Sequence, residues 1–130
     1  MPKLTTEILF TILLTVPAFA MSQTAGVDAW EGRWVAQGTL FQVGITINES
    51  VIAVNEVESL GFVWNSGEGQ VNGNVARIPV QYAGVKGIVR VELVNANTAV
   101  AIAASCMPDF MVVCALARGR QAIFKRVQIE

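Results

Sequence analysis

The chain has no histidine, only two cysteines and few charged residues, which make up 15% of its 130 residues. Without histidine, neither Ser-His-Asp nor Cys-His catalysis is possible, and the most common nitrogen ligand of protein-bound metals is missing. The cysteines, Cys106 and Cys114, are too far apart for a Cys-x-x-Cys redox or zinc motif. We therefore expect no catalytic residues of these types, no cofactor and no metal site.

An excess of one charge is also lacking, because nine Lys and Arg residues nearly balance ten Asp and Glu residues to give a net charge of −1. Binding to nucleic acid or to an anionic membrane uses clustered basic side chains. The one basic cluster, over residues 118–126, is typical of a solvated face, although it also offers a surface to an acidic partner. Glu56 and Glu58 share a strand face, but nothing in the sequence pairs them with another carboxylate. We expect no nucleic-acid partner and no enzymatic activity.

The one long apolar stretch lies near the N-terminus, over residues 8–20. Lys3 precedes it, and residues 18–20 have the small-x-small pattern that signal peptidase cleaves. The stretch is shorter than the roughly 20 residues that span a bilayer, so an uncleaved anchor helix is the weaker interpretation. We predict a cleaved signal peptide over residues 1–20, a flexible lead over 21–29 and one domain over 30–130. This domain is then secreted or periplasmic, with no stable membrane insertion after cleavage.

From residue 30 onward the chain has the pattern of an all-β protein. Apolar and polar residues alternate over residues 41–48, 75–82 and 85–93, which is the period of half-buried strands. Further strands are predicted over residues 51–57, 60–64, 98–105, 111–117 and 121–129. Alanines in two of these segments favour a helix, but the valines and isoleucines between them favour strands. Pro79 cannot donate a ladder hydrogen bond, so its strand lies at an edge, at a bulge or beside a weak seam.

Eight or nine short strands joined by tight turns predict an antiparallel meander. A meander of this size removes its exposed edges most simply by closing on itself. We therefore predict an all-β fold, an antiparallel up-and-down barrel of about eight strands, with a sandwich as the alternative. The small residues of the last strands indicate a narrow, filled interior.

The two cysteines flank a short segment with Pro108 and Asp109 at a turn position. If a hairpin turns there, Cys106 and Cys114 fall on facing strands with both side chains on one face. In a secreted chain this arrangement predicts a disulfide rather than free thiols. Its expected role is structural, with a stabilisation of the order of 2 kcal/mol because the closed loop is short.

The most distinctive stretch is residues 30–34, Trp-Glu-Gly-Arg-Trp, at the start of the first strand. Gly32 and Trp34, together with Lys125 and Arg126 in the last strand, resemble the pattern of lipocalins and of the wider calycin group. The resemblance implies an eight-stranded barrel that binds small apolar ligands. It also implies that Trp34 packs across the closed end beneath an arginine from near the C-terminus, here Arg126. The alternative is that Trp34 is simply a large core residue.

Two groups of residues are candidate binding sites. Aromatic side chains in a barrel mouth contact ligands or fill the core, and the candidates for ligand contact are Trp30, Trp64, Phe62 and Tyr82. The second group is apolar at a predicted hairpin tip, where polar residues are usual, and consists of Met107, Pro108, Phe110 and Met111. This tip either contacts a protein partner or folds over the barrel end.

Two functions are compatible with these features. The first is a non-catalytic binding protein that acts as inhibitor or adaptor of a secreted enzyme or other protein partner, through the lead or the tip. It predicts a filled core and an exposed apolar tip. The second is a carrier of a small apolar ligand, which predicts an internal cavity of at least about 300 Å³ lined by the four aromatic residues. The filled interior expected from the small residues favours the first.

Overall fold

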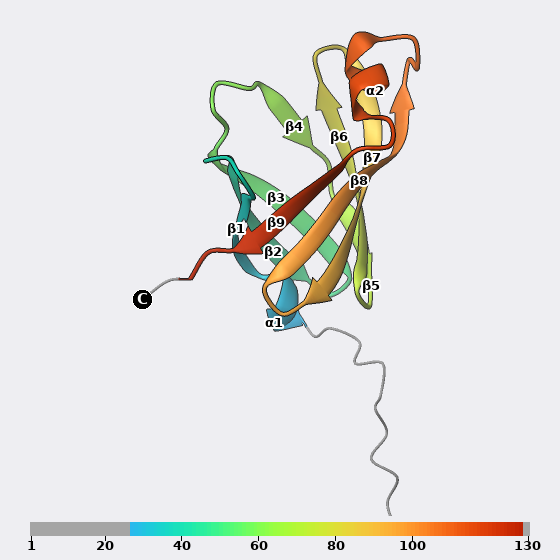
Figure 1. The fold of residues 1–130 in the computed structure, drawn as a ribbon. Helices are drawn as coiled ribbons and strands as arrows, with labels where there is room; N and C mark the ends of the chain where they lie inside the picture. The colour runs from blue at the N-terminus through green and yellow to red at the C-terminus, as the bar shows by residue number, and fades with distance from the viewer. Residues whose placement is uncertain (1–26, 129–130) are drawn as a thin grey trace, which may run out of the picture.

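A computed structural model describes residues 27–128, which form a ring of antiparallel strands with a short helix at each end (Figure 1). The helices are α1 (Val27–Trp30) and α2 (Val112–Ala117). The strands are β1 (Gly32–Ala36), β2 (Gln42–Asn48), β3 (Val51–Glu58), β4 (Trp64–Ser66), β5 (Gly69–Asn72), β6 (Val75–Tyr82), β7 (Val85–Asn95), β8 (Thr98–Met107) and β9 (Gln121–Arg126). The predicted signal peptide lies outside the described residues. Of the predicted lead, the last residues form part of α1.

The strands close into the predicted barrel. Each of the pairs β1–β2, β2–β3, β6–β7, β7–β8 and β8–β9 is an antiparallel neighbour pair, and β1 also pairs with β9. Both β4 and β5 pair with β6, one with each half of it, so the two short strands together occupy one position in the ring. The prediction of an all-β, closed antiparallel barrel of eight strands is therefore confirmed, and the sandwich alternative is wrong.

The hairpin of β6 and β7 shows why these residues form strands. In β6, Ala76 and Ile78 are buried while Arg77 between them is exposed, as the alternating pattern predicts. The turn between the strands consists of two residues, Ala83 and Gly84, which have φ values of 51° and 81°. Two positive φ values in a two-residue turn match the right-handed twist of the strands that the turn joins. Local sequence and sheet twist thus agree at this hairpin.

Pro79 lies at a weak seam, one of the three positions that the sequence allows. On one side it pairs with Ile88 of β7. On the other side its carbonyl accepts a hydrogen bond from the Gly67 N–H (3.0 Å), at the point where the chain passes from β4 to β5. Because proline has no N–H, the ladder on this side is interrupted there.

The wall is also incomplete between β3 and β4. β3 pairs with β5 only at Val51 and Ile52. Farther along, the link described between β3 and β4 is a side-chain hydrogen bond, in which the Ser66 hydroxyl donates to the Val54 carbonyl (3.2 Å). The barrel is therefore more tightly paired at the α1 end than at the other end.

The predicted strand over residues 111–117 is wrong, because α2 occupies this segment. Helical hydrogen bonds join the Ala115 N–H to the Met111 carbonyl and the Arg118 N–H to the Cys114 carbonyl, each at 3.1 Å. A strand needs a free sheet edge, but β8 already pairs with β7 on one side and β9 on the other. The alanines of the segment then favour the helix.

The predicted strand over residues 60–64 is also wrong, since only Trp64 belongs to a strand. Leu60 and Gly61 have φ values of 53° and 83°, and the Phe62 N–H donates to the Ser59 carbonyl (2.9 Å). These features define a tight turn, and glycine accommodates the positive φ at no steric cost. The turn lies in the connection between β3 and β4.

Candidate functional site

The barrel contains a cavity of about 340 Å³, which runs from two buried tryptophans at the α1 end to the half-exposed Phe62 at the opposite end. The expectation of a filled interior is therefore wrong. The number and stagger of the strands set the width of a barrel, so small residues on its inner face leave space rather than narrow the ring. Ala99 and Ala101 of β8, which suggested a narrow interior, line this cavity.

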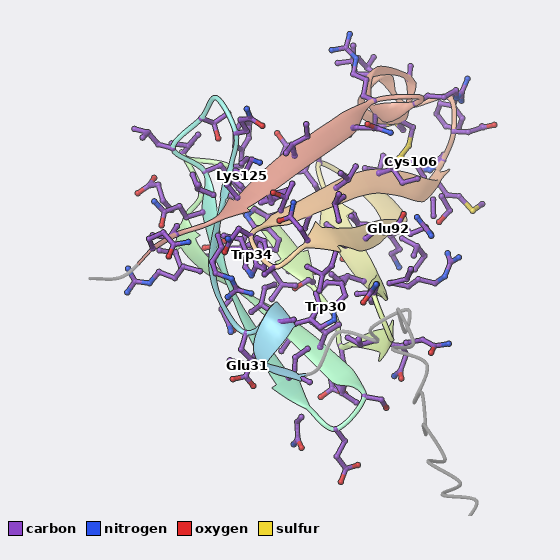
Figure 2. All side chains as sticks on the ribbon, turned by 60° about the horizontal axis from the view of Figure 1, so that its bottom comes forward. Trp30, Glu31, Trp34, Glu92, Cys106 and Lys125 are labelled. Carbon is purple, nitrogen blue, oxygen red and sulfur yellow. A yellow bond between two sulfur atoms is a disulfide. The ribbon has the colours of Figure 1, made fainter. Side chains whose placement is uncertain are left out.

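Trp30 and Trp34 form the floor of the cavity, and each is only 3% exposed. The Trp30 indole N–H donates to the Gly73 carbonyl (3.1 Å) in the turn between β5 and β6, and the Trp34 indole N–H donates to the Trp30 carbonyl (3.0 Å). Figure 2, in which the α1 end is turned forward, places both side chains within the ring of strands. Because both indole N–H groups are satisfied, the floor presents apolar ring surface to the cavity.

Arg126 of β9 closes the barrel beneath this floor. Its guanidinium carbon lies 4.5 Å from the centre of the Trp34 ring, within the range of a cation–π contact. The same side chain donates hydrogen bonds to the carbonyls of Ala29, Glu31 and Ala96. A single side chain thus joins α1, the start of β1 and the turn between β7 and β8.

The conformation of Gly32 explains the motif that precedes Trp34. Gly32 has a φ of 128°, which only glycine adopts without strain. A β-carbon at this position would lie 2.8 Å from a guanidinium nitrogen of Arg126. The glycine therefore allows the arginine to approach the backbone at the closed end, so the sequence pattern and the Trp34–Arg126 contact have one structural cause.

The wall of the cavity is aliphatic. Inward-facing valines and isoleucines come from β2, β3, β6 and β7, and two alanines come from β8. Alternation along each strand places these side chains inside and their neighbours outside. None of the residues that line the cavity carries a formal charge.

Aromatic side chains surround the open end. Phe62 and Tyr82 stand edge to face with ring centres 5.8 Å apart. Phe41 lies between Trp64 and Phe124, at 6.0 and 6.4 Å respectively. All five side chains line the cavity, and we call them the aromatic rim.

The structure brings the four predicted ligand contacts together around one cavity. Trp30 lies in the floor, while Phe62, Trp64 and Tyr82 belong to the aromatic rim. Phe41 and Phe124 also line the cavity, but they were not among the ligand contacts expected from the sequence. Phe41 was detectable, because it has the same phase as the inward-facing Val43 and Ile45 in the alternating segment.

Hydrogen bonding within the protein uses nearly all side-chain polar groups of the lining. The Trp64 indole N–H donates to the Ser59 hydroxyl (3.1 Å), and the Ser66 hydroxyl donates to the Val54 carbonyl. Within residues 27–128, no buried side-chain nitrogen or oxygen lacks a partner. Within residues 27–128, the hydroxyl of the half-buried Tyr82 is the lining group left to bond with water or a ligand.

The second candidate site lies outside the cavity. A disulfide joins Cys106 of β8 to Cys114 of α2, which confirms the predicted bond but places it between a strand and a helix. Between them, Met107, Pro108 and Phe110 are exposed and Met111 is half-buried. None of these four residues lines the cavity, so the tip does not fold into the barrel as a plug.

The described part of the chain provides little beyond the barrel for classification. No helix within residues 27–128 is long and apolar enough to cross a membrane. In the same range, no group of three or more His, Cys, Asp or Glu side chains is placed to hold a metal ion. The eight-stranded antiparallel barrel is consistent with a calycin-like fold. Comparisons of the chain with protein-family models, curated proteins and solved structures find no match.

Proposed function

We propose that the protein is a non-catalytic carrier that binds a small apolar ligand inside its barrel. The observation that supports this proposal is the cavity of about 340 Å³, lined by aliphatic and aromatic side chains. Its size falls within the range of ligand pockets, about 300 to 1,000 Å³. The four aromatic residues chosen from the sequence are all part of the lining.

The chemistry of the lining indicates the class of ligand. A polar or charged ligand would lose its hydration and gain few hydrogen bonds in return, which is costly. An apolar ligand loses no such bonds and removes its own surface from water. The Tyr82 hydroxyl at the open end can bond a single polar group, such as a hydroxyl, at one end of the ligand.

The inhibitor or adaptor hypothesis, which the sequence favoured, receives partial support. Its exposed apolar tip is present, with Met107 and Phe110 at 68% and 79% exposure. It also predicted a filled core, however, and the cavity does not agree with that prediction. The carrier function accounts for the cavity, and we therefore prefer it.

We place this carrier outside the cytoplasm and group it with the calycins. The disulfide between Cys106 and Cys114 is of a kind that forms and persists in oxidising compartments. The barrel and the Arg126 contact with Trp34 agree with what the lipocalin resemblance implies. A secreted or periplasmic calycin-like carrier is the interpretation that combines these features.

A cavity-filling substitution tests the proposal. Ala101→Leu places a larger side chain inside the cavity, while Ala53→Leu makes the same change at a β3 residue that is not in the lining. The assay is a fluorescence titration of each protein with N-phenyl-1-naphthylamine, a neutral apolar dye. We expect the native protein and Ala53→Leu to bind the dye equally, and Ala101→Leu to bind it at least about tenfold more weakly.

Two results would count against the carrier. The first is that the native protein does not bind the dye. The second is that Ala101→Leu and Ala53→Leu bind the dye with equal affinity, which would place it outside the cavity. Native mass spectrometry of protein isolated from its own compartment extends the test. A co-purified small molecule that Ala101→Leu lacks would identify the natural ligand.

A further inference from the structure

Exposed apolar side chains gather at the open end of the barrel. Eleven large apolar side chains of the described residues are exposed. Eight of them lie in, or directly beside, the loops that join the strands at this end. Leu40 and Val63 belong to the loops before β2 and β4. Met107, Phe110, Val112 and Leu116 belong to the tip and α2 on the other side of the mouth (Figure 1). We call these six residues the apolar crown.

Helix α2 is apolar on every side. Its sequence is Val-Val-Cys-Ala-Leu-Ala, with Cys114 turned inward and 2% exposed. On the outer side, Val112 and Leu116 are 70% and 60% exposed. These two residues are four positions apart and share one face of the helix. A helix that is hydrophobic all round is normally buried, so this outer face fits an apolar environment better than water.

Basic side chains lie beside the crown, although the net charge of the chain is −1. Arg118 and Arg120 directly follow α2, and Lys86 of β7 pairs with Met107 of β8. All three basic side chains are exposed, and the tip contributes one acidic residue, Asp109. The overall charge balance, which argues against an anionic partner, therefore does not hold on this side of the mouth.

We propose that the apolar crown docks on the surface of a lipid bilayer, with the mouth of the cavity facing the lipid. The crown residues enter the interface between headgroups and acyl chains, and Arg118, Arg120 and Lys86 contact anionic headgroups. Apolar side chains next to basic ones are typical of segments that lie on a membrane without crossing it. The disulfide between Cys106 and Cys114 fixes α2 at the barrel end, so that the crown is presented as one surface.

The position of the cavity favours a bilayer over a protein as the occupant of this surface. This step rests on the proposed carrier function, because an apolar ligand is stored in membranes and dissolves poorly in water. The crown lies on two sides of the open end rather than along one side of the barrel, so docking brings lipid to the aromatic rim. A protein partner on the same surface would cover the only end at which the rim is exposed in the described part of the chain.

Co-flotation with lipid vesicles tests the proposal. The vesicles consist of phosphatidylcholine alone or of phosphatidylcholine mixed with phosphatidylglycerol. The double variant Val112→Ser/Leu116→Ser removes the outer face of α2. Val94→Ser is the matched control, because Val94 is 61% exposed but lies near the end of β7, on the α1 side. A fourth protein, Arg118→Gln/Arg120→Gln, removes two charges and keeps the apolar residues.

We expect the native protein and Val94→Ser to float with mixed vesicles equally. The α2 double variant should bind at least about tenfold more weakly, because it loses the outer face of α2, which supplies two of the six apolar side chains that enter the interface. The arginine double variant should lose about tenfold in affinity for mixed vesicles and little for phosphatidylcholine alone. All substituted side chains are exposed, so the thermal midpoints should stay close to that of the native protein.

Three results would overturn membrane docking. The first is that the native protein binds neither kind of vesicle. The second is that Val94→Ser weakens binding as much as the α2 double variant does. The third is a dimer without lipid that Val112→Ser/Leu116→Ser dissociates, since a second copy would then cover the crown.

Docking and ligand binding can fail separately. Ala101→Leu should float with vesicles like the native protein, because its substitution is inside the barrel. Dye binding without flotation would refute docking and leave the carrier function intact. Flotation without dye binding would refute the carrier function and the role of docking in ligand transfer.

Discussion

The two ends of the barrel differ in the contacts that hold their side chains in place. At the α1 end, Trp30 and Trp34 are buried with satisfied indole groups, and Arg126 donates to three carbonyls while covering the Trp34 ring. At the open end, the rim side chains meet mainly through ring contacts, and β3 pairs with β2 on one side but, beyond Ile52, with no described strand on the other. One covalent link, between Cys106 and Cys114, holds α2.

This difference indicates a division of tasks within one small domain. Burial and hydrogen bonding at the α1 end hold the barrel closed. The side chains of the open end therefore do not have to hold the barrel closed. Ligand-binding segments are generally drawn from the less stable parts of a protein. Substitutions at the two ends should therefore separate effects on the free energy of unfolding from effects on binding.

Trp34→Ala should have the largest effect, a loss of about 3 to 5 kcal/mol in the free energy of unfolding, as is typical when a buried aromatic residue is truncated. The substitution also removes the ring that Arg126 covers and the hydrogen bond to the Trp30 carbonyl. Urea-induced unfolding followed by circular dichroism measures the loss. Leu40→Ala, at an exposed position of the open end, is the control and should change stability by less than about 0.5 kcal/mol. Equal losses in the two variants would contradict the division between the ends.

The contact between Trp34 and Arg126 was expected from the resemblance to lipocalins, which rests on short sequence features at the two ends of the domain. A glycine two positions before a tryptophan and an arginine in the last strand are features of the sequence itself. The strand phases over residues 75–82 and 85–93 were also predictable, because each inward side chain alternates with an outward one. The barrel therefore follows from short-range pattern and from the need to remove sheet edges, whereas its closed end was expected from the resemblance alone.

The open end was less predictable because its structure depends on distant contacts. The segment that forms α2 contains both alanine and valine, and its state is decided by the lack of a free edge on β8. The cavity depends on the width of the ring, which no single strand determines. In residues 60–64, the signal that was missed is Gly61, whose positive φ marks a turn.

Removal of the disulfide should have the second largest effect. In the chain-entropy description, a bridge between residues eight positions apart stabilises the fold by about 2.5 kcal/mol. Cys106→Ser/Cys114→Ser should lose about this amount in urea-induced unfolding. A reducing agent should destabilise the native protein to the same extent and leave the double variant unchanged. If the measured mass shows that reduction is complete and the unfolding midpoint is unchanged, the disulfide does not stabilise the open end.

Arg126→Ala should follow, with a loss of about 2 kcal/mol, since hydrogen bonds from a charged donor are worth about 1.5 to 3 kcal/mol. Arg126→Lys keeps the charge but not the planar fork, so it should recover only part of the loss. Arg33→Ala is the matched control, because Arg33 is an exposed arginine in β1. Unfolding measured in high salt sharpens the comparison. The Arg126 effect should persist there if it arises from partly buried hydrogen bonds rather than from long-range charge attraction.

Phe62→Ala should have the smallest effect on stability, about 1 kcal/mol, because the half-exposed ring buries only part of its surface. Its effect on binding should be the reverse, with several-fold weaker binding of N-phenyl-1-naphthylamine, since the ring forms the rim together with Tyr82. Phe62→Leu restores apolar bulk and should recover most of this affinity. If the ratio of lost stability to lost dye affinity were the same in Phe62→Ala as in Trp34→Ala, the two ends would not be separable. A loss of affinity at nearly native stability would show that the open end serves binding while the closed end maintains the fold.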